Sequence, residues 1–273
     1  MAPTRCALDN TVTDQKAFAK LSKLKDHQLV DLYRKVSDKN RALSDDGPVA
    51  ATTWAILENH PDDAALYEEL CYHMFAAGFS RKVVREKWPA HREAFSGFDP
   101  SGLAETDPQI IETLVTDRSL IRNRRKLSAV LDNARTIMQI KGEFGSFRQW
   151  LGSFSADRIY LLHRELVDRF TCVGRSAAEW FLLSSGFPYY FQTADAVRMI
   201  KRLGLMPKQN KDEAFNSVVM SFQAASGVTA WQISIDFWRF ASGFRMREAI
   251  CAEAPNCAKC PLWDYCDFFN QNG

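Results

Sequence analysis

Four cysteines near the C-terminus are the residues whose type and spacing carry the clearest chemistry. They fall within sixteen residues, with gaps of five, two and five residues between them: Cys251, Cys257, Cys260 and Cys266. Thiolates this close can enclose one zinc ion or one iron–sulfur cluster. Zinc modules usually use two separated C-x2-C knuckles, whereas this segment has one, and Pro261 follows its second cysteine. The spacing favours a 4Fe–4S cluster, with zinc as the alternative.

The cellular compartment decides whether clustered cysteines form disulfides or bind metal. The chain has 273 residues and seven cysteines, and the other three are scattered, at Cys6, Cys71 and Cys172. Met1–Asn10 lacks the apolar region of a secretory signal, and no apolar run reaches the length of a bilayer. We therefore expect a cytoplasmic, nucleoid-associated protein without a membrane partner, in which the thiols stay reduced and the cluster binds metal.

A short turn between two expected helices has the features of a phosphate site. In the segment 172–176, which reads CVGRS, Gly174 precedes the start of a helix. Backbone N–H groups at a helix start point toward an anion, and the helix dipole favours negative charge there. Contacts from the backbone to phosphate do not depend on base sequence. Such turns also simply join helices, so the motif by itself leaves both interpretations open.

One carboxylate is the candidate for charge-stabilising chemistry. Asp195 is the only acidic residue in the stretch 193–205, and it stands at the expected start of a helix, where Asp is a common cap. A carboxylate can also stabilise positive charge that develops at a reacting carbon, and can orient or deprotonate an attacking water. The two roles are compatible, because a capping carboxylate can still face a cleft.

Helices must position these residues, because the pattern is helical almost throughout. Apolar residues recur with a period near 3.6, no run alternates convincingly as a strand does, and there is no internal repeat. Residues 1–50 are polar and are expected to form an arm with one helix, and 96–106 and 204–211 are expected to be loops. The expected helices lie near residues 27–36, 66–77, 110–115, 127–138, 159–169, 175–185, 196–203, 212–224 and 231–241.

The cysteine segment resembles a known iron–sulfur module. Phe237, Trp238 and Gly243 precede the first cysteine, and residues 255–262 read PNCAKCPL. This arrangement is similar to the C-terminal loop of endonuclease III and the adenine-mismatch DNA glycosylases, in the helix-hairpin-helix superfamily, where the first gap is usually six residues rather than five. The resemblance implies a non-catalytic 4Fe–4S cluster that shapes a DNA-binding loop, whose basic residue here is Lys259.

The turn at 172–178 resembles the hairpin of the same superfamily. That motif reads roughly PGVGRxTA, and Cys172 takes the place of its first glycine here. In bifunctional members a lysine follows the motif arginine and forms a Schiff base with the sugar, whereas Ser176 stands at that position. The resemblance therefore implies a monofunctional glycosylase, which leaves an abasic site without cutting the strand.

Downstream of the hairpin, residues 193–205 read TADAVRMIKRLGL. They are similar to the family's VDTHVxRVxxRLGL, in which the aspartate is catalytic. The resemblance makes Asp195 the catalytic candidate. The alignment needs a small shift in the loop, because counting back from Arg202 without a gap places the family's aspartate at Thr193.

Residues 66–187 resemble a second branch of the superfamily, the type I 3-methyladenine DNA glycosylases. The likeness includes FSGFDP at 95–100 and IRNRRKL at 121–127. That branch has a base-recognising glutamate where His73 stands and a stacking tryptophan near Arg81, and its zinc-binding residues have no clear counterparts. The resemblance thus implies a shared scaffold, without the branch's specificity for methyladenine.

Three residues are candidates for a base pocket. His73 lies on the apolar face of its expected helix, so it is either a core residue or a hydrogen-bonding partner of a flipped base. Tyr189 and Tyr190 fall in the loop before Asp195, where an aromatic ring could stack on such a base.

Net charge is only +2, so local clusters of positive charge must carry any argument for nucleic acid. The segments 118–126 and 81–87 are the densest basic runs. A charge run is usually a solvated face, and phosphate binding is the alternative interpretation. The candidate DNA contacts are Val173, Gly174, Arg175, Ser176, Arg122, Arg124, Arg125 and Lys126.

Together these features predict an all-α, two-lobed helix-hairpin-helix DNA glycosylase fold with a C-terminal iron–sulfur cluster loop. Residues 1–61 would form an arm and a helix that packs with the C-terminal lobe, 62–188 a helical barrel with the hairpin, and 189–273 the segment of Asp195, the C-terminal helices and the cluster loop. The expected function is base excision from double-stranded DNA by a monomer. The alternatives are a non-catalytic DNA-binding or redox-sensing protein and a bifunctional glycosylase/lyase.

Overall fold

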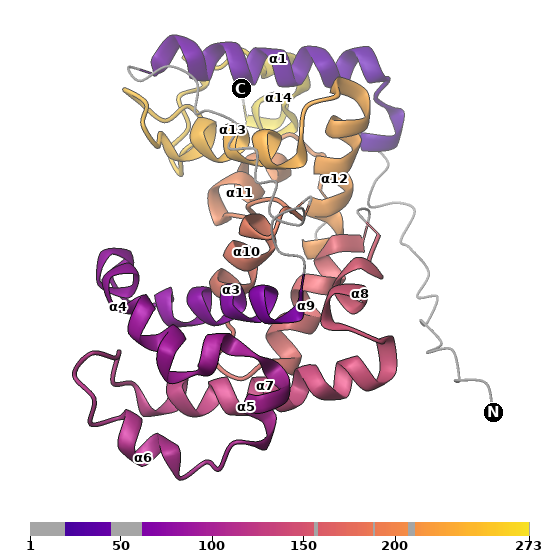
Figure 1. The fold of residues 1–273 in the computed structure, drawn as a ribbon. Coiled ribbons are helices and arrows are strands. Elements are labelled where there is room, and N and C mark those ends of the chain that lie inside the picture. The colour runs from indigo at the N-terminus through magenta and orange to yellow at the C-terminus, as the bar shows by residue number, and fades with distance from the viewer. Residues whose placement is uncertain (1–19, 45–61, 156–157, 188, 207–210, 273) are drawn as a thin grey trace, which may run out of the picture.

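The structure is a computed structural model that describes residues 20–44, 62–155, 158–187, 189–206 and 211–272. In these residues every regular element is a helix or a 3₁₀ turn, which confirms the all-α expectation. Figure 1 shows two lobes, one containing α3 to α9 and the other containing α1 and α12 to α14, with α10 and α11 at their junction. None of the described helices has both the length and the apolar character that a membrane span requires.

The helices of the first lobe are α3 (Asp63–Ala76), α4 (Arg81–Ala94), α5 (Pro100–Glu105), α6 (Ile110–Leu114), α7 (Arg124–Phe144), α8 (Phe147–Gly152), α9 (Ile159–Arg169) and α10 (Arg175–Ser184). Those of the second are α1 (Asp26–Leu43), α11 (Ala194–Arg202), α12 (Lys211–Ser226), α13 (Ala230–Ser242) and α14 (Asp267–Asn272). The 3₁₀ turns are η1 (Leu21–Lys23), η2 (Ser96–Phe98), η4 (Cys257–Lys259) and η5 (Trp263–Tyr265).

The expectation of a loop at 96–106 was wrong, because this segment contains η2 and α5. Asp99 caps α5, since its side chain accepts hydrogen bonds from the backbone N–H groups of Ser101 and Gly102. Pro100 occupies the first helical position, where the missing N–H costs nothing. Asp-Pro thus begins a short helix here instead of a turn.

α3 forms the centre of the first lobe and packs against α4, α7, α8 and α10. Its buried residues are not confined to one stripe, as expected of a helix surrounded by others; they are Leu66, Tyr67, Leu70, Cys71, His73, Met74 and Phe75. α7 packs in turn against α5 and α8. This packing fixes the start of α7 and the hairpin between α9 and α10 in one rigid unit.

α1 joins the second lobe through buried polar contacts as well as apolar ones. It packs against α12 and α13. The Tyr33 hydroxyl donates to Asp236 Oδ2 at 2.7 Å, and Asn40 Nδ2 donates to the backbone oxygen of Asp236 at 2.9 Å. Because the partners of Asp236 are buried, these bonds fix the position of α1 along α13. The rest of the expected N-terminal arm, residues 1–19 and 45–61, lies outside the described residues.

Candidate active site

The turn between α9 and α10 has the geometry of a phosphate-binding hairpin. Cys172 has a φ of +63°, a conformation that suits glycine, and the family motif has glycine at this position. Val173 is buried and anchors the turn, while Gly174, Arg175 and Ser176 are exposed. No side chain caps the start of α10, so its first backbone N–H groups are free of side-chain acceptors. These are the donors that a phosphate oxygen would use.

Replacing Cys172 with glycine should stabilise the protein by about 1 kcal/mol, because the left-handed conformation strains any residue with a Cβ. Cys172→Val, which adds a β-branch at the same position, should be destabilising. The midpoint of urea unfolding measures both changes, provided that the dependence of the unfolding free energy on urea concentration is the same in all variants. If the Cys172→Gly variant were less stable than the parent, the contacts of the Cys172 side chain would stabilise the fold by more than the strained backbone destabilises it.

Asn133 of α7 holds the hairpin turn, a contact that the sequence interpretation missed. Its Nδ2 donates to the backbone oxygen of Thr171 at 3.0 Å, and its Oδ1 accepts from the backbone N–H of Thr171 at 2.7 Å. Asn133 itself is buried. One amide side chain thus satisfies both backbone groups of a turn residue and fixes the hairpin relative to α7.

The start of α7 lies beside the hairpin, because the Cys172 Sγ is 3.8 Å from the backbone oxygen of Arg125. Two of the four basic residues predicted here have partners inside the protein. Arg124 pairs with Glu112, and the Lys126 ammonium donates to the backbone oxygens of Phe75 and Ala77, at the end of α3.

Arg122 and Arg125 differ from these two. Both are exposed, and neither has an ion-pair partner among the residues that the structure describes. Of the four candidate DNA contacts at the start of α7, these two therefore have guanidinium groups that are available to bind phosphate.

Asp195 lies in the first turn of α11, as its second residue. Thr193 is the cap, because its side chain accepts from the backbone N–H of Ala196 at 3.1 Å. α11 runs without interruption to Arg202, so Thr193 keeps the ungapped position of the family's aspartate and Asp195 lies two residues beyond it. The Asp195 side chain is 35% exposed and pairs with Arg198 at 2.7 Å.

Arg198 connects this carboxylate to the end of α13 and to the cysteine loop. Besides Asp195, it donates to the backbone oxygens of Ala241, at the end of α13, and Cys251, each at 3.4 Å. It also lines a cavity of about 600 Å³ between α11 and α14, together with Lys201 and Arg202. Three basic side chains of α11 and one acidic side chain, Asp267, thus line this cavity.

His73 is one member of a hydrogen-bonded group in the first lobe. Its Nε2 lies 2.9 Å from Glu69 Oε1 and 2.9 Å from Ser184 Oγ. The Ser184 hydroxyl donates to the backbone oxygen of Phe181 at 3.2 Å, so both neighbours of Nε2 act as acceptors and Nε2 carries a proton. Glu69 was missed, although its spacing of four residues before His73 on one helix was visible in the sequence.

Aromatic rings surround this group. The His73 ring lies nearly parallel to the Trp180 ring, with centroids 6.5 Å apart. The Arg81 guanidinium lies over the Trp180 ring, 3.9 Å from its centroid. The arrangement presents a guanidinium and an aromatic plane next to a donor–acceptor group, which suits hydrogen bonding and stacking with a planar base.

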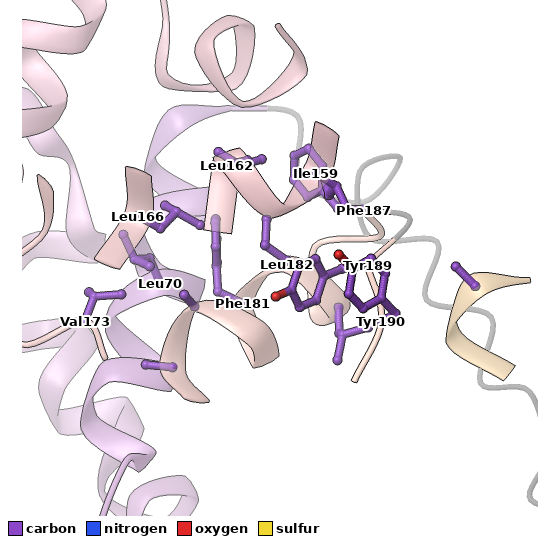
Figure 2. Packing of buried hydrophobic residues seen from close by; sticks show 14 of the residues in the cluster. Leu70, Ile159, Leu162, Leu166, Val173, Phe181, Leu182, Phe187, Tyr189 and Tyr190 are labelled. Atoms are coloured by element: carbon purple, nitrogen blue, oxygen red, sulfur yellow. The ribbon is translucent and has the colours of Figure 1, made fainter. Parts of the chain in front are cut away.

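Tyr189 and Tyr190 do not lie on an accessible surface. They are 2% and 0% exposed, and the two rings stack with centroids 4.9 Å apart. Tyr189 also stacks on His163, and Figure 2 shows both tyrosines among Ile159, Leu182 and Phe187. The expectation of accessible rings is therefore not met, because their loop is packed into the core, and the hypothesis that they stack on a base stays a prediction.

Arg175, at the start of α10, is held by partners inside the protein. Its guanidinium pairs with Asp212 of α12 at 3.4 Å and donates to Gln192 Oε1 at 3.4 Å. Glu179 lies one turn further along α10, and burial raises its pKa to about 7, with Arg175 lowering it and Asp212 raising it. The start of α10 is thus coupled to a carboxyl group that titrates near neutrality.

This group should make stability depend on pH. Since the folded-state pKa of Glu179 is raised, the native state holds a proton that the unfolded chain loses from about pH 4.5, and stability falls as the pH rises toward 7. Glu179→Gln should remove this loss and be more stable than the parent by about 1–2 kcal/mol at pH 8, with no difference at pH 4. Urea unfolding at the two pH values measures it. Equal stability at pH 8 would show that Glu179 is solvated.

The four cysteines of the predicted cluster lie in the loop between α13 and α14. Burial, together with the neighbouring thiols of this loop, raises the pKa of Cys260 to about 11. Cys266 Sγ lies 3.5 Å from the backbone oxygen of Arg202. Arg202 Nη1 lies 3.6 Å from Cys251 Sγ. Among the described residues, however, no three His, Cys, Asp or Glu side chains converge as ligands of a single metal ion. In these residues the four thiols thus form no ready single-ion site.

Residues 51–173 match the family model described as methyladenine glycosylase. The central part of the chain is thus similar to the methyladenine glycosylases. The matched segment includes α3 to α9 and most of the hairpin, and it ends before Asp195 and the cysteines.

Individual relatives match about a third of the chain. DNA-3-methyladenine glycosylase 1 of Escherichia coli is 33% identical over 101 residues, which are 37% of this chain and 53% of that protein. The Haemophilus influenzae DNA-3-methyladenine glycosylase is 32% identical over 93 residues, 34% of this chain and 50% of that protein. The chain thus spans about half the length of the curated relatives that it matches.

Two solved structures illustrate the range of similarity. A 3-methyladenine DNA glycosylase I is 28% identical, with a TM-score of 0.41 over 46% of this chain and 79% of that chain. The 8-oxoguanine DNA glycosylase of Thermotoga maritima is 13% identical, with a TM-score of 0.43 over 82% of this chain and 100% of that chain.

Proposed function

We propose that this protein is a monofunctional DNA glycosylase that acts as a monomer on double-stranded DNA in the cytoplasm. The observation that carries the proposal is the hairpin at residues 170–174. Its turn is left-handed at Cys172, it is held by Asn133, and it leaves the start of α10 without a side-chain cap. Arg122 and Arg125 provide exposed positive charge on the same lobe. Together they suit sequence-independent binding of the phosphate backbone.

Asp195 supplies the chemistry in this proposal. When the bond between the sugar and the base breaks, the electron pair leaves with the base and positive charge develops on the sugar. The Asp195 carboxylate stabilises that charge and orients the water that adds to the sugar. Arg198 holds the carboxylate in place, since its guanidinium is itself fixed by hydrogen bonds to the backbone oxygens of Ala241 and Cys251. Ser176 stands where bifunctional relatives have a lysine, so no Schiff base forms there.

The base is recognised at His73 and Glu69. The relatives are named for 3-methyladenine, but in this protein the helix position of their glutamate holds a histidine that shares its proton with Glu69 and Ser184. Arg81 over Trp180 adds positive charge beside this group. The proposed substrate is therefore a damaged or modified base. Specificity for 3-methyladenine is not carried over from the relatives, and experiment has to identify the base.

The test is a panel of labelled duplexes that each carry one alkylated, oxidised, deaminated, mismatched or hypermodified base. After incubation, each sample is divided and one half is treated with hot alkali. We expect breaks at one class of base, and only after alkali. Breaks without alkali, trapped by borohydride as a covalent complex, would establish the bifunctional alternative. No release from any substrate by a protein that binds DNA tightly would favour a non-catalytic binding protein.

We also propose that Cys251, Cys257, Cys260 and Cys266 hold a 4Fe–4S cluster. The spacing of the four cysteines supports this, as does the position of Cys251 and Cys266, whose Sγ atoms both lie at Arg202. The Arg202 guanidinium near Cys251 Sγ would stabilise a thiolate ligand. The cluster would organise the loop that follows α13, and it has no step in base excision.

Metal analysis of protein purified without oxygen tests this assignment. We expect four irons and four sulfides per chain, lost in a Cys257→Ser, Cys260→Ser variant and retained in Cys172→Ser, which alters a thiol outside the module. One zinc per chain and no sulfide would replace the iron–sulfur assignment with a zinc site.

A further inference from the structure

The loop from Ser242 to Ile250, here called the 242–250 loop, is held rigidly at the end of α13. Gly243 ends the helix with a φ of +75°, and a Cβ there would lie 2.9 Å from the backbone nitrogen of Ala249. The backbone N–H of Ile250 donates to the oxygen of Phe240 at 3.0 Å, closing the loop. Only glycine permits this turn, so the backbone of the loop is defined by its packing.

A buried arginine fixes the tip of the loop from below. Arg239 is 2% exposed, and its guanidinium donates to the backbone oxygens of Phe244 at 3.4 Å and Arg245 at 3.5 Å. It also donates to Ser44 Oγ, just after α1, at 3.0 Å. Arg245 has a φ of +51°, an unfavourable conformation for a side chain that only surrounding contacts can maintain.

This rigid loop presents an aromatic ring to solvent. Phe244 is 44% exposed, and its inner face stacks on Trp238 with centroids 4.5 Å apart and planes inclined by 22°. The Arg245 guanidinium lies 5.5 Å from the Phe244 centroid. An exposed ring supported by a second ring and flanked by a guanidinium is the arrangement on which nucleobases stack beside a phosphate backbone.

Both ends of the 242–250 loop lie at the candidate catalytic carboxylate. Arg198, the ion-pair partner of Asp195, donates to the backbone oxygens of Ala241 and Cys251, which directly precede and follow the loop. Trp238 is one helical turn before Ala241 on α13. The loop that carries the aromatic pair is therefore anchored at both ends to the ion-pair partner of Asp195.

We propose that Phe244 stacks on a base left unstacked next to the extruded nucleotide, with Arg245 contacting the adjacent phosphate. This inference rests on the proposed function, since it places DNA at Asp195. Extruding a nucleotide removes one stacking neighbour from each flanking base, and an aromatic side chain can replace it. The rigid loop makes this replacement favourable, because little side-chain freedom is lost on binding.

The probe is a duplex with a tetrahydrofuran abasic analogue and 2-aminopurine on one side of it, on the other side, or opposite it. This duplex needs no knowledge of the base that is excised. The parent protein should quench 2-aminopurine at one of these positions. Phe244→Ala should lose the quenching and bind about tenfold more weakly, whereas Phe244→Trp should retain both. Arg245→Ala should reduce the salt dependence of binding by about one phosphate contact, and Phe244→Ala should not.

Phe144→Ala is the matched control, because Phe144 is 40% exposed at the far end of α7 from the hairpin. It should change neither quenching nor affinity. Quenching and affinity that survive in Phe244→Ala, with the parent preferring the abasic duplex to an intact one, would overturn the stacking role and leave the proposed function standing. A parent that binds both duplexes equally would contradict the proposed function and this inference with it.

Discussion

Asp195→Asn should slow base release at least about a hundredfold while leaving DNA affinity within a few fold. The amide has the shape of the carboxylate but no charge, so it cannot stabilise the positive sugar. Arg198 keeps its bonds to Ala241 and Cys251, so the local backbone should hold. Single-turnover release of the base, with enzyme in excess over duplex, measures the chemical step without product dissociation.

Asp212→Asn is the matched control for this experiment. Asp212 also lies in the first turn of a helix, also pairs with an arginine, and is 38% exposed against 35% for Asp195. It should release the base at the parental rate. If the two variants lost activity equally, or neither did, Asp195 would be only a structural ion-pair partner of Arg198.

Asn133→Ala should destabilise the protein by about 2 kcal/mol, because two hydrogen bonds to Thr171 are lost. It should also weaken binding to any duplex by about tenfold, since the hairpin would no longer be fixed relative to α7. Asn123→Ala removes only the cap at the start of the same helix, where Oδ1 accepts from the backbone N–H of Lys126, and should cost about 1 kcal/mol.

Binding and urea unfolding of the two variants together separate stability from hairpin geometry. Asn123→Ala should keep its DNA affinity. A parental affinity in Asn133→Ala would show that the hairpin holds its shape without the clamp, or that it does not contact DNA.

Residues with local signals were predictable from the sequence. The period of apolar residues located α7, and the glycine turn at 174 located the start of α10, because both depend on neighbours in the chain. α4 was missed as a helix because its many charged residues were interpreted as a basic run, although Val84 and His91 form a buried side.

Features that depend on distant partners were not predictable. Tyr189 and Tyr190 were expected in a loop at the site, and only the packing of α9 and α12 buries them. The clamp between Asn133 and Thr171 joins residues 38 apart, and the pairing of Arg198 with Ala241 joins residues 43 apart. The sequence also does not indicate that the Lys126 ammonium donates to backbone oxygens at the end of α3. Because of these bonds, Lys126 is not among the basic residues available to DNA.

The most direct measurement of the central claim is the number of abasic sites formed in duplex DNA. Genomic DNA that has been methylated, oxidised or deaminated is incubated with the protein or with Asp195→Asn, and its aldehydes are counted with an aldehyde-reactive probe. We expect abasic sites to accumulate in at least one damaged sample with the parent and not with the variant. No increase in any sample, from protein that still binds duplex DNA, would contradict the assignment as a glycosylase.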